Sequence, residues 1–231
     1  MLIILAKRGD ETAAWLADRW RRHDAVLVSP ADLSRSGWNL HLASPGKSTT
    51  RIGRRDVRND EIDGVVTRIP CVEADDLHHI VPSDRQYVAS EMTAFLLVWL
   101  SSLACPILNH PTPNSLGGPG WRPEQWTQLA SRLGIRVTPV QRKTPDYTTH
   151  SAEKSGCEVT VIGEACFGDV TEPLITKARK LAKAAGATLL SVHFKGSDAN
   201  SAFVRASVWP DLASPGIADA VLHCLSGKAV C

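Results

Sequence analysis

The side chains best suited to bind a ligand gather in residues 109–122, a stretch rich in glycine and proline. This stretch contributes amide, imidazole, indole and guanidinium groups, at Asn109, His110, Asn114, Trp121 and Arg122. Trp121 offers a stacking surface, and the planar fork of Arg122 matches a carboxylate. A helix is expected to begin beside Arg122, and its positive N-terminal end adds to that charge. We therefore predict a site for an anionic ligand here, although the prolines and packing of Trp121 explain these residues equally well.

A second candidate site joins the last two strands that the sequence predicts. If these strands pair, His193 and Arg205 project from one face, where a cation can hold an anion directly. The plainer alternative is that Arg205 only forms an ion pair with Asp198 or Asp211.

Other chemistry has weaker support. The sequence contains no Gly-x-Ser-x-Gly elbow of a serine hydrolase. The glycine-rich run 117–120 lacks the Lys-Ser/Thr tail of a phosphate-binding loop. Asp75, His78 and His79 resemble a metal cluster on paper, but adjacent histidines point apart on any regular element, so a solvated helix start is favoured. No metal site is predicted, because histidines and cysteines do not fall into ligand spacing.

Length and composition are those of an ordinary globular chain. It has 231 residues, of which 43% are hydrophobic and 22% charged, and a formal net charge of +2. This charge argues against nucleic acid as a partner, since backbone binding needs a clustered excess of Lys and Arg. The apolar runs are too short for a signal segment or a membrane span. The six cysteines form no Cys-x-x-Cys pair, so we expect reduced thiols in a cytoplasmic protein that does not contact a membrane.

Hydrophobic patterning in the first part of the chain predicts a parallel sheet with helices. The expected elements are strands at 2–5, 25–28, 65–69, 106–109 and 135–140, and helices at 12–22, 83–103 and 124–133. A strand, a helix and a second strand at the start are typical of a doubly wound sheet. A hairpin is expected from 38–42 and 49–52. The arginines and acids of 51–61 are interpreted as a solvated loop of mixed charge.

The composition then changes. Residues 141–156 are polar and are interpreted as a linker. After it we expect strands at 158–162, 188–194 and 202–208, and helices at 174–185 and 217–225.

The order of these elements resembles the ATP-grasp superfamily, in particular the ligases related to glutathione synthetase and to ribosomal-protein glutamate ligases. The resemblance rests on residues 65–70, on 82–85 with Tyr87 and Glu91, and on 106–109, which match a strand, a long helix and an Asn-x-Pro loop of such ligases. Residues 157–231 are similar to the C-terminal segment of the family, which carries the metal-binding strands. The resemblance covers most of the chain, and none of its motifs is highly specific.

Two departures from the family pattern bear on function. Between Val140 and Cys157 the chain has no counterpart of the central domain that grips ATP in the family. Alignment to the family pattern also places His193, Arg205 and Ser207 where acidic and amide ligands of Mg²⁺ are expected. A guanidinium repels metal ions, and histidine prefers softer ones.

We therefore expect an α/β protein with a Rossmann-like, pre-ATP-grasp domain over 1–140, a linker over 141–156 and a C-terminal α/β remnant of the ATP-grasp domain over 157–231, packed on the first. The expected function is that of a pseudoenzyme: a non-catalytic binding or partner protein, accessory to a peptide-modifying or amide-forming enzyme. It would bind a small anionic ligand or a peptide or protein partner, without ATP or Mg²⁺. One alternative is a working ATP-dependent carboxylate–amine ligase whose nucleotide site a partner subunit completes. Another is a structural module that forms a homodimer.

Overall fold

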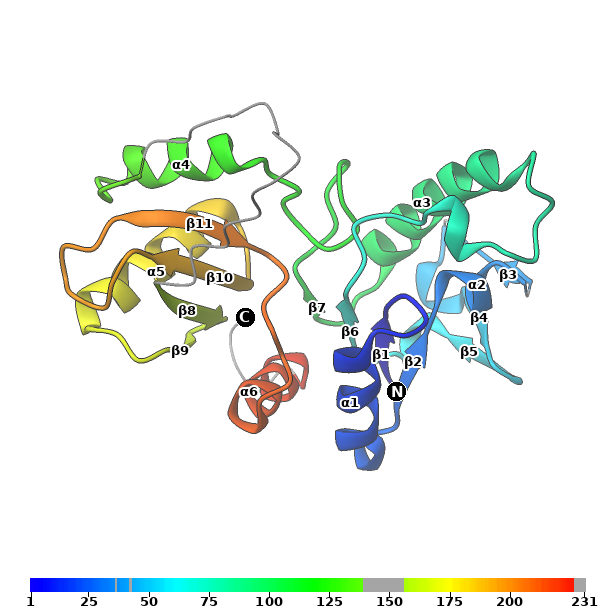
Figure 1. Ribbon diagram of the computed structural model, residues 1–231. Coiled ribbons are helices and arrows are strands. Elements are labelled where there is room, and N and C mark those ends of the chain that lie inside the picture. Colours follow the sequence, from blue (N-terminus) through cyan, green and yellow to red (C-terminus); the bar gives the residue numbers. More distant parts are fainter. Residues whose placement is uncertain (36, 42, 139–155, 227–231) are drawn as a thin grey trace. The chain divides into compact units, whose positions relative to one another are not determined.

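The computed structural model describes residues 1–35, 37–41, 43–138 and 156–226 (Figure 1). The chain divides into two compact units, one formed by Met1–Gly120 with Asp211–Cys231 and the other by Trp121–Pro210. The helix expected at 124–133, which was assigned to the N-terminal domain, lies in the second unit. The helix expected at 217–225, which was assigned to the C-terminal remnant, lies in the first unit. The linker expected at 141–156 lies outside the described residues except for Gly156.

The first unit is built on a parallel sheet of four strands in the order β2-β1-β6-β7. These strands are β1 (Leu2–Leu5), β2 (Ala25–Val28), β6 (Gly64–Thr67) and β7 (Ile107–Leu108). All residues of β1 and β6 are buried, which explains why both read as short apolar runs bounded by polar residues. The parallel arrangement that the sequence predicts is confirmed.

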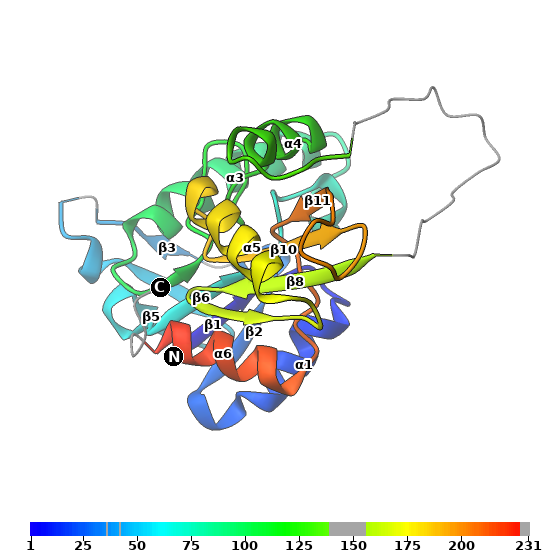
Figure 2. The same ribbon diagram turned by 90° about the vertical axis from the view of Figure 1, so that its left-hand side faces the viewer.

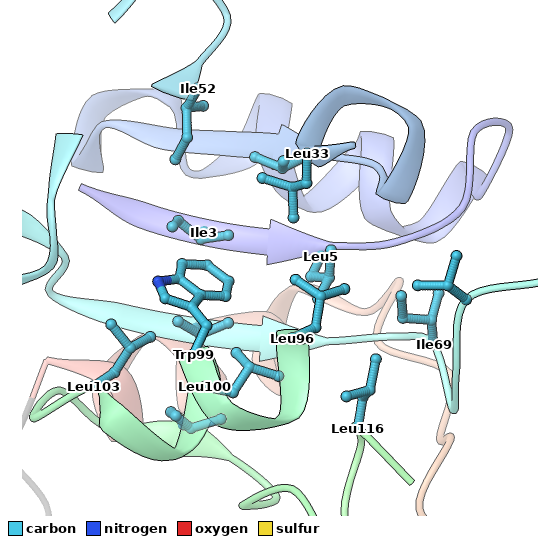
Figure 3. Packing of buried hydrophobic residues seen from close by; sticks show 14 of the residues in the cluster. Ile3, Leu5, Leu33, Ile52, Ile69, Leu96, Trp99, Leu100, Leu103 and Leu116 are labelled. Carbon is cyan, nitrogen blue, oxygen red and sulfur yellow. The ribbon is translucent and has the colours of Figure 1, made fainter. Parts of the chain in front are cut away.

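Helices lie against this sheet: α1 (Glu11–Arg19), α2 (Pro30–Leu33), α3 (Arg85–Ser102) and α6 (Pro215–Leu225). Asp10 caps α1 by accepting the Ala13 N–H at 2.9 Å. Trp99 and Leu96 of α3 are fully buried against Ile3 and Leu5 of β1 in the main hydrophobic core (Figure 3).

The C-terminal helix α6 belongs to this first unit. A Cβ atom at Gly64 would lie 3.0 Å from the Leu225 Cβ, so the close packing of α6 on β6 depends on glycine at that position. The guanidinium of Arg19 in α1 also binds both carboxylate oxygens of Asp219 in α6, at 2.8 and 2.9 Å. Figure 2 shows α6 beside α1.

The unit also carries an antiparallel sheet of three strands, β3 (Trp38–Asn39), β4 (Thr49–Ile52) and β5 (Arg55–Arg58). The interpretation of 51–61 as a solvated loop was wrong in part, because Gly53, with φ of +63°, turns the chain into β5 and Val57 is fully buried. Arg51 of β4 and Asp56 of β5 pair across this hairpin. Short 3₁₀ turns cover Arg21–His23, Pro45–Lys47, Asn59–Glu61 and Ala74–Asp76.

The second unit is an antiparallel sheet in the order β11-β10-β8-β9, with two helices on one face. Its strands are β8 (Cys157–Ile162), β9 (Ala165–Phe167), β10 (Leu189–Phe194) and β11 (Phe203–Ser207), and its helices are α4 (Pro123–Arg132) and α5 (Glu172–Ala185). Figure 2 shows α5 lying across β8 and β10. The predicted pairing of the last two strands is confirmed, as is a mixed α/β fold for the whole chain.

Of the strand expected at 135–140, the described part makes one parallel bridge, between Val137 and Phe203. Residues 139 and 140 lie outside the described part of the chain. No helix in the described part is long and apolar enough to cross a membrane.

Candidate functional site

Three ionisable side chains lie in a row across the sheet of the second unit. His193 of β10 is directly opposite Glu158 of β8 on one side and Arg205 of β11 on the other. Because side chains alternate between the faces of a strand, these three share one face, while Val159 and Val192 point into the core under α4 and α5. The geometry that the sequence analysis required of His193 and Arg205 is therefore present. We call Glu158, His193 and Arg205 the ionic row.

The side chains of the ionic row are partly exposed to solvent. The Nε2 atom of His193 lies 3.8 Å from Glu158 Oε2, and the two side chains are 19% and 43% exposed. Burial lowers the pKa of His193, and the nearby Arg205 guanidinium lowers it further, whereas the Glu158 carboxylate raises it. His193 is therefore biased towards the neutral imidazole, which leaves Arg205 as the fixed positive charge of the row.

Next to the ionic row, the same face carries hydroxyl groups. Ser191 of β10 is opposite both Thr160 and Ser207, and its Oγ donates a hydrogen bond to the Ser207 carbonyl at 3.4 Å. Ser191 and Thr160 are buried. This face is therefore polar over two successive rows.

Arg205 is exposed and points to no acid in the part of the second unit that the structure describes. Asp198, its proposed partner, instead accepts hydrogen bonds from the Asn200 N–H and the Ser201 hydroxyl. These bonds, with the charge of Lys177, lower the pKa of Asp198. The alternative in which Asp198 neutralises Arg205 is not observed.

A cavity of about 350 Å³ opens beside the first residues of β11. Arg136 and Lys195 supply its cations, and Thr138, Asp198, Asn200 and Ser201 its other polar groups. This cavity was not predicted, since residues 195–202 have the composition of a polar turn. The available signal was the position of two cations, Arg136 inside the strand expected at 135–140 and Lys195 directly after the strand expected at 188–194.

The other candidate, residues 109–122, is divided between the two units. Asn109, His110 and Asn114 lie in the first unit, and Trp121 and Arg122 lie in the second with His193 and Arg205. His110 and Asn114 are exposed, whereas Asn109 is buried. The structure thus places these residues in separate units.

Hydrogen bonds within the loop itself account for much of its order. Thr112 and Ser115 exchange both backbone hydrogen bonds, and the Thr112 hydroxyl donates to the Gly118 carbonyl at 3.0 Å. Asn109 adopts a positive φ of 55°, and a Cβ at Gly118 would lie 2.5 Å from its Cβ. The close approach that Gly118 permits is therefore to the Asn109 side chain.

Trp121 and Arg122 directly precede α4, and Arg122 is its N-cap. The Trp121 ring lies 4.7 Å from that of Trp126, so part of its stacking surface is already in use. Arg122 is exposed, and its backbone N–H donates to Gln125 Oε1 at 2.9 Å. Its guanidinium makes no hydrogen bond or ion pair with another described residue.

At the carboxyl edge of the parallel sheet, where open α/β sheets commonly bind ligands, the protein's own ion pairs occupy the loops. Arg68 binds Asp10 and Lys7 binds Glu73. His79 lies in a neighbouring pocket and shares a hydrogen bond with Ser34 Oγ at 3.1 Å. Among the described residues, no group of three or more His, Cys, Asp or Glu side chains is arranged to hold a metal ion.

Neither a family model nor a curated protein sequence matches this chain. Solved structures do. The macrocyclase MdnC from Microcystis aeruginosa, bound to the precursor peptide MdnA, superimposes with a TM-score of 0.71 at 12% identity, over 99% of this chain and 100% of that one. A RiPP-associated ATP-grasp ligase from Chryseobacterium gregarium, in complex with ADP and a leader and core peptide, gives 0.69 at 10% identity, over 99% and 97%. This chain has an ATP-grasp-like fold.

A third ATP-grasp structure agrees: a RimK domain protein from Sphaerobacter thermophilus gives a TM-score of 0.51 at 13% identity, over 99% of both chains. The fold that the sequence resemblance implied is confirmed. Identities this low show the fold alone and carry no information on activity.

The ATP-grasp resemblance assigns the Mg²⁺ ligands to the positions of His193, Arg205 and Ser207, and the residues there do not fit that ion. Mg²⁺ demands oxygen ligands, usually including carboxylates. The one carboxylate in the ionic row, Glu158, faces His193, and Arg205 brings a positive charge to the same face. The donor set suits an anion better than a divalent cation.

Proposed function

We propose that this chain is a non-catalytic ATP-grasp-like protein that binds an anionic segment of a peptide or protein partner, and that it is accessory to a peptide-modifying enzyme. The observation that carries the proposal is the side-by-side placement of His193 and Arg205 on the polar face of the second unit. A fixed guanidinium there attracts carboxylates and repels the metal ions on which acyl-phosphate chemistry depends.

Chain length supports the same conclusion. The segment between Thr138 and Gly156 is far too short to hold a domain, since domains take on the order of 50 residues or more. The ATP-grasp resemblance locates the nucleotide-clasping domain at this point of the chain.

Structural relatives indicate the kind of partner. The structure of MdnC contains a bound precursor peptide, and that of the Chryseobacterium ligase contains a leader and core peptide. We transfer from them only the class of partner, a peptide, because the fold alone is shared.

Isothermal calorimetry with Mg-ATP and with an acidic peptide tests the proposal. We expect no heat of binding with Mg-ATP up to millimolar concentration and measurable binding of the peptide. Micromolar affinity for Mg-ATP by the isolated chain contradicts the proposal and favours the ligase whose site a partner completes. Arg205→Glu should weaken binding of the acidic peptide. Arg132→Glu, at the exposed end of α4, is the matched control and should leave that binding unchanged.

A further inference from the structure

A small cavity lies at the carboxyl edge of the parallel sheet, within the first unit. Its volume is about 170 Å³, below the roughly 300 Å³ at which sites for drug-sized molecules begin. The loops that follow β1, β2 and β6 form its walls, and open α/β sheets commonly bind ligands at this position. Its lining includes three cations, two acids and two histidines. The size and the charges of this cavity suit a small ion or a single charged group.

Arg35 brings to the cavity a positive charge that no acid in the described part of the chain neutralises. It is exposed, and its guanidinium forms no hydrogen bond or ion pair with another described residue. The other two cations have partners, since Arg8 binds Asp32 at 2.7 Å and Lys7 binds Glu73. Both keep further N–H groups that these acids do not use. An anion in the cavity therefore meets one unpaired guanidinium and several spare donors.

The two acids of the cavity, Asp75 and Asp76, belong to the turn beside Lys7. The hydrogen bond with Glu73 and the charge of Asp76 both raise the pKa of Lys7. Asp76 Oδ2 also accepts the Glu73 N–H at 2.8 Å. The cavity is therefore acidic towards Lys7 and basic towards Arg35.

His79, on the basic side of the cavity, lies among arginines. Burial lowers its pKa, and the charges of Arg35, Arg8 and Arg85 lower it further, so the imidazole is biased towards the neutral form. These arginines come from three segments of the chain, the loop after β1, the loop after α2 and the start of α3. Like charges brought together in this way favour a bound anion.

The hydrogen bonds of Ser34 indicate the tautomer of His79. The single O–H of Ser34 donates to the Ala31 carbonyl at 3.2 Å, so Ser34 Oγ accepts the His79 Nε2–H at 3.1 Å. Nδ1 then carries no proton in the neutral ring. His79 can donate a second hydrogen bond only after it takes up a proton, and a bound anion favours that uptake because it offsets the arginines.

We propose that this cavity binds a phosphate group, as free phosphate or as a small phosphate monoester, through Arg35, Arg8 and His79. Donors that reach the cavity from separate segments suit a tetrahedral anion, whereas a carboxylate presents two oxygens in one plane to a single fork. The site lies in the first unit and does not depend on the proposed function. In Mg-ATP the metal ion already neutralises the terminal phosphate, so the expectation for Mg-ATP is unchanged.

The test uses the full chain, labelled with ¹⁵N, and the probes inorganic phosphate, methyl phosphate and acetate at constant ionic strength. We expect phosphate to bind with millimolar or better affinity, with NMR shifts centred on the amides of Arg8 and Arg35 and on the His79 ring. Equal binding of methyl phosphate identifies the ligand as a monoester, and binding of phosphate alone identifies it as the free ion. Acetate should cause no saturable shift.

Variants separate a site from an effect of overall charge. Arg35→Gln removes the unpaired cation and should weaken phosphate about tenfold. Asp75→Asn removes a negative charge from the same cavity and should strengthen it. The matched control is Arg22→Gln, because Arg22 is also exposed and lies in the turn before β2, at the opposite edge of the sheet. This variant should bind phosphate like the parent.

The imidazole of His79 gives a local measurement. Sulfate is the probe, because its charge stays constant between about pH 5 and pH 8, where histidine titrates. We expect saturating sulfate to raise the pKa of His79 in an NMR titration. Without an anion, Arg35→Gln should also raise that pKa, since it removes one of the charges that lower it.

Distinct results overturn the proposal. If acetate binds with the affinity of phosphate, the cavity takes any anion and the preference for a phosphate group is wrong. If Arg35→Gln and Arg22→Gln weaken phosphate equally, only overall charge is at work and there is no site. If millimolar phosphate leaves the His79 ring unshifted, the proposal fails. None of these results bears on the peptide site proposed for the second unit.

Discussion

Arg68 donates a hydrogen bond from Nε to Asp10 Oδ2 at 2.8 Å, and both side chains are less than one-fifth exposed, at 16% and 18%. The pair links the loop after β1 to the loop after β6, at the carboxyl edge of the parallel sheet. Asp10 is also the N-cap of α1, so its two carboxylate oxygens serve the helix and the ion pair at once. The protein's own charges therefore occupy part of this edge, beside the pocket that Lys7, Arg8 and His79 line.

Arg68→Ala leaves Asp10 largely buried without its partner. Loss of one member of a buried ion pair costs about 3 kcal/mol, so we expect the free energy of unfolding, measured by urea denaturation, to fall by about that amount. Arg8→Ala is the control, because Arg8 pairs with Asp32 at exposures of 64% and 44%. An exposed pair of that kind contributes less than about 1 kcal/mol. Equal effects of the two variants would show that the Asp10–Arg68 pair has no special weight.

Gly118→Ala tests the packing of the loop that follows β7. The new Cβ would lie 2.5 Å from the Asn109 Cβ, at a φ of +100° that L-residues rarely adopt. Gly134→Ala shares the positive φ, at +75°, but meets no atom within 4 Å. We expect Gly134→Ala to cost about 1 kcal/mol from backbone strain and Gly118→Ala to cost clearly more, on the order of 3 kcal/mol, because a contact must also give way. Similar thermal shifts for both would mean that Asn109 moves freely.

Much of the fold was readable from apolar periodicity. The expected strand at 25–28 and the expected helix at 83–103 match β2 and α3 closely, because burial on one face leaves a regular pattern. Strand β5 was missed, since Val57 is the one buried side chain among its four residues and the rest are charged. The place of α6 in the first unit depends on contact with Gly64, which no local pattern reveals.

For the candidate site, the alternation of strands was enough to place His193 and Arg205 together. Sequence alone could not predict the role of the loop 109–122. A polar loop that binds a ligand and one whose residues hydrogen-bond to each other have the same composition. Asn109 illustrates the point: it is an amide with a positive φ, buried against Gly118. The cavity with Arg136 and Lys195 needed three-dimensional structure, since its walls come from segments far apart in the chain.

Arg122→Ala and Arg205→Ala separate the two candidate sites of the second unit. Both residues are exposed, so each substitution should change the free energy of unfolding by no more than about 0.5 kcal/mol. If the ionic row holds the partner, only Arg205→Ala weakens binding of an acidic peptide in calorimetry. Weakening by Arg122→Ala alone would move the site to the N-terminus of α4.

Burial raises the pKa of the Cys105 thiol to about 11. At pH 8 the thiolate is then about one part in a thousand of this cysteine, and alkylation requires the thiolate. Burial raises the pKa of the Cys157 thiol less than that of Cys105. We therefore expect Cys105 to react with iodoacetamide far more slowly than Cys157 when peptides are followed by mass spectrometry. Unfolding in urea should abolish the difference. Equal rates in the folded protein would show that Cys105 is open to solvent.

The pKa of His193 provides a direct test of the ionic row. Burial and the charge of Arg205 lower it below the ordinary value of 6.5, and Glu158 raises it. In NMR titrations of the imidazole, Arg205→Gln should therefore raise the pKa of His193, and Glu158→Gln should lower it further. No change in either variant would contradict the geometry of the row.

The same shift predicts how stability depends on pH. Because the pKa of His193 is lower in the folded than in the unfolded chain, the folded state binds fewer protons between the two values. The contribution of His193 is thus fully present above about pH 6.5 and is lost as the pH falls through the folded pKa. The free energy of unfolding should therefore decline on acidification below pH 6.5, and His193→Gln should make that decline shallower. His79 also has a lowered pKa, so His79→Gln is the matched comparison. A decline that His193→Gln leaves unchanged would assign the acid sensitivity to groups outside the ionic row.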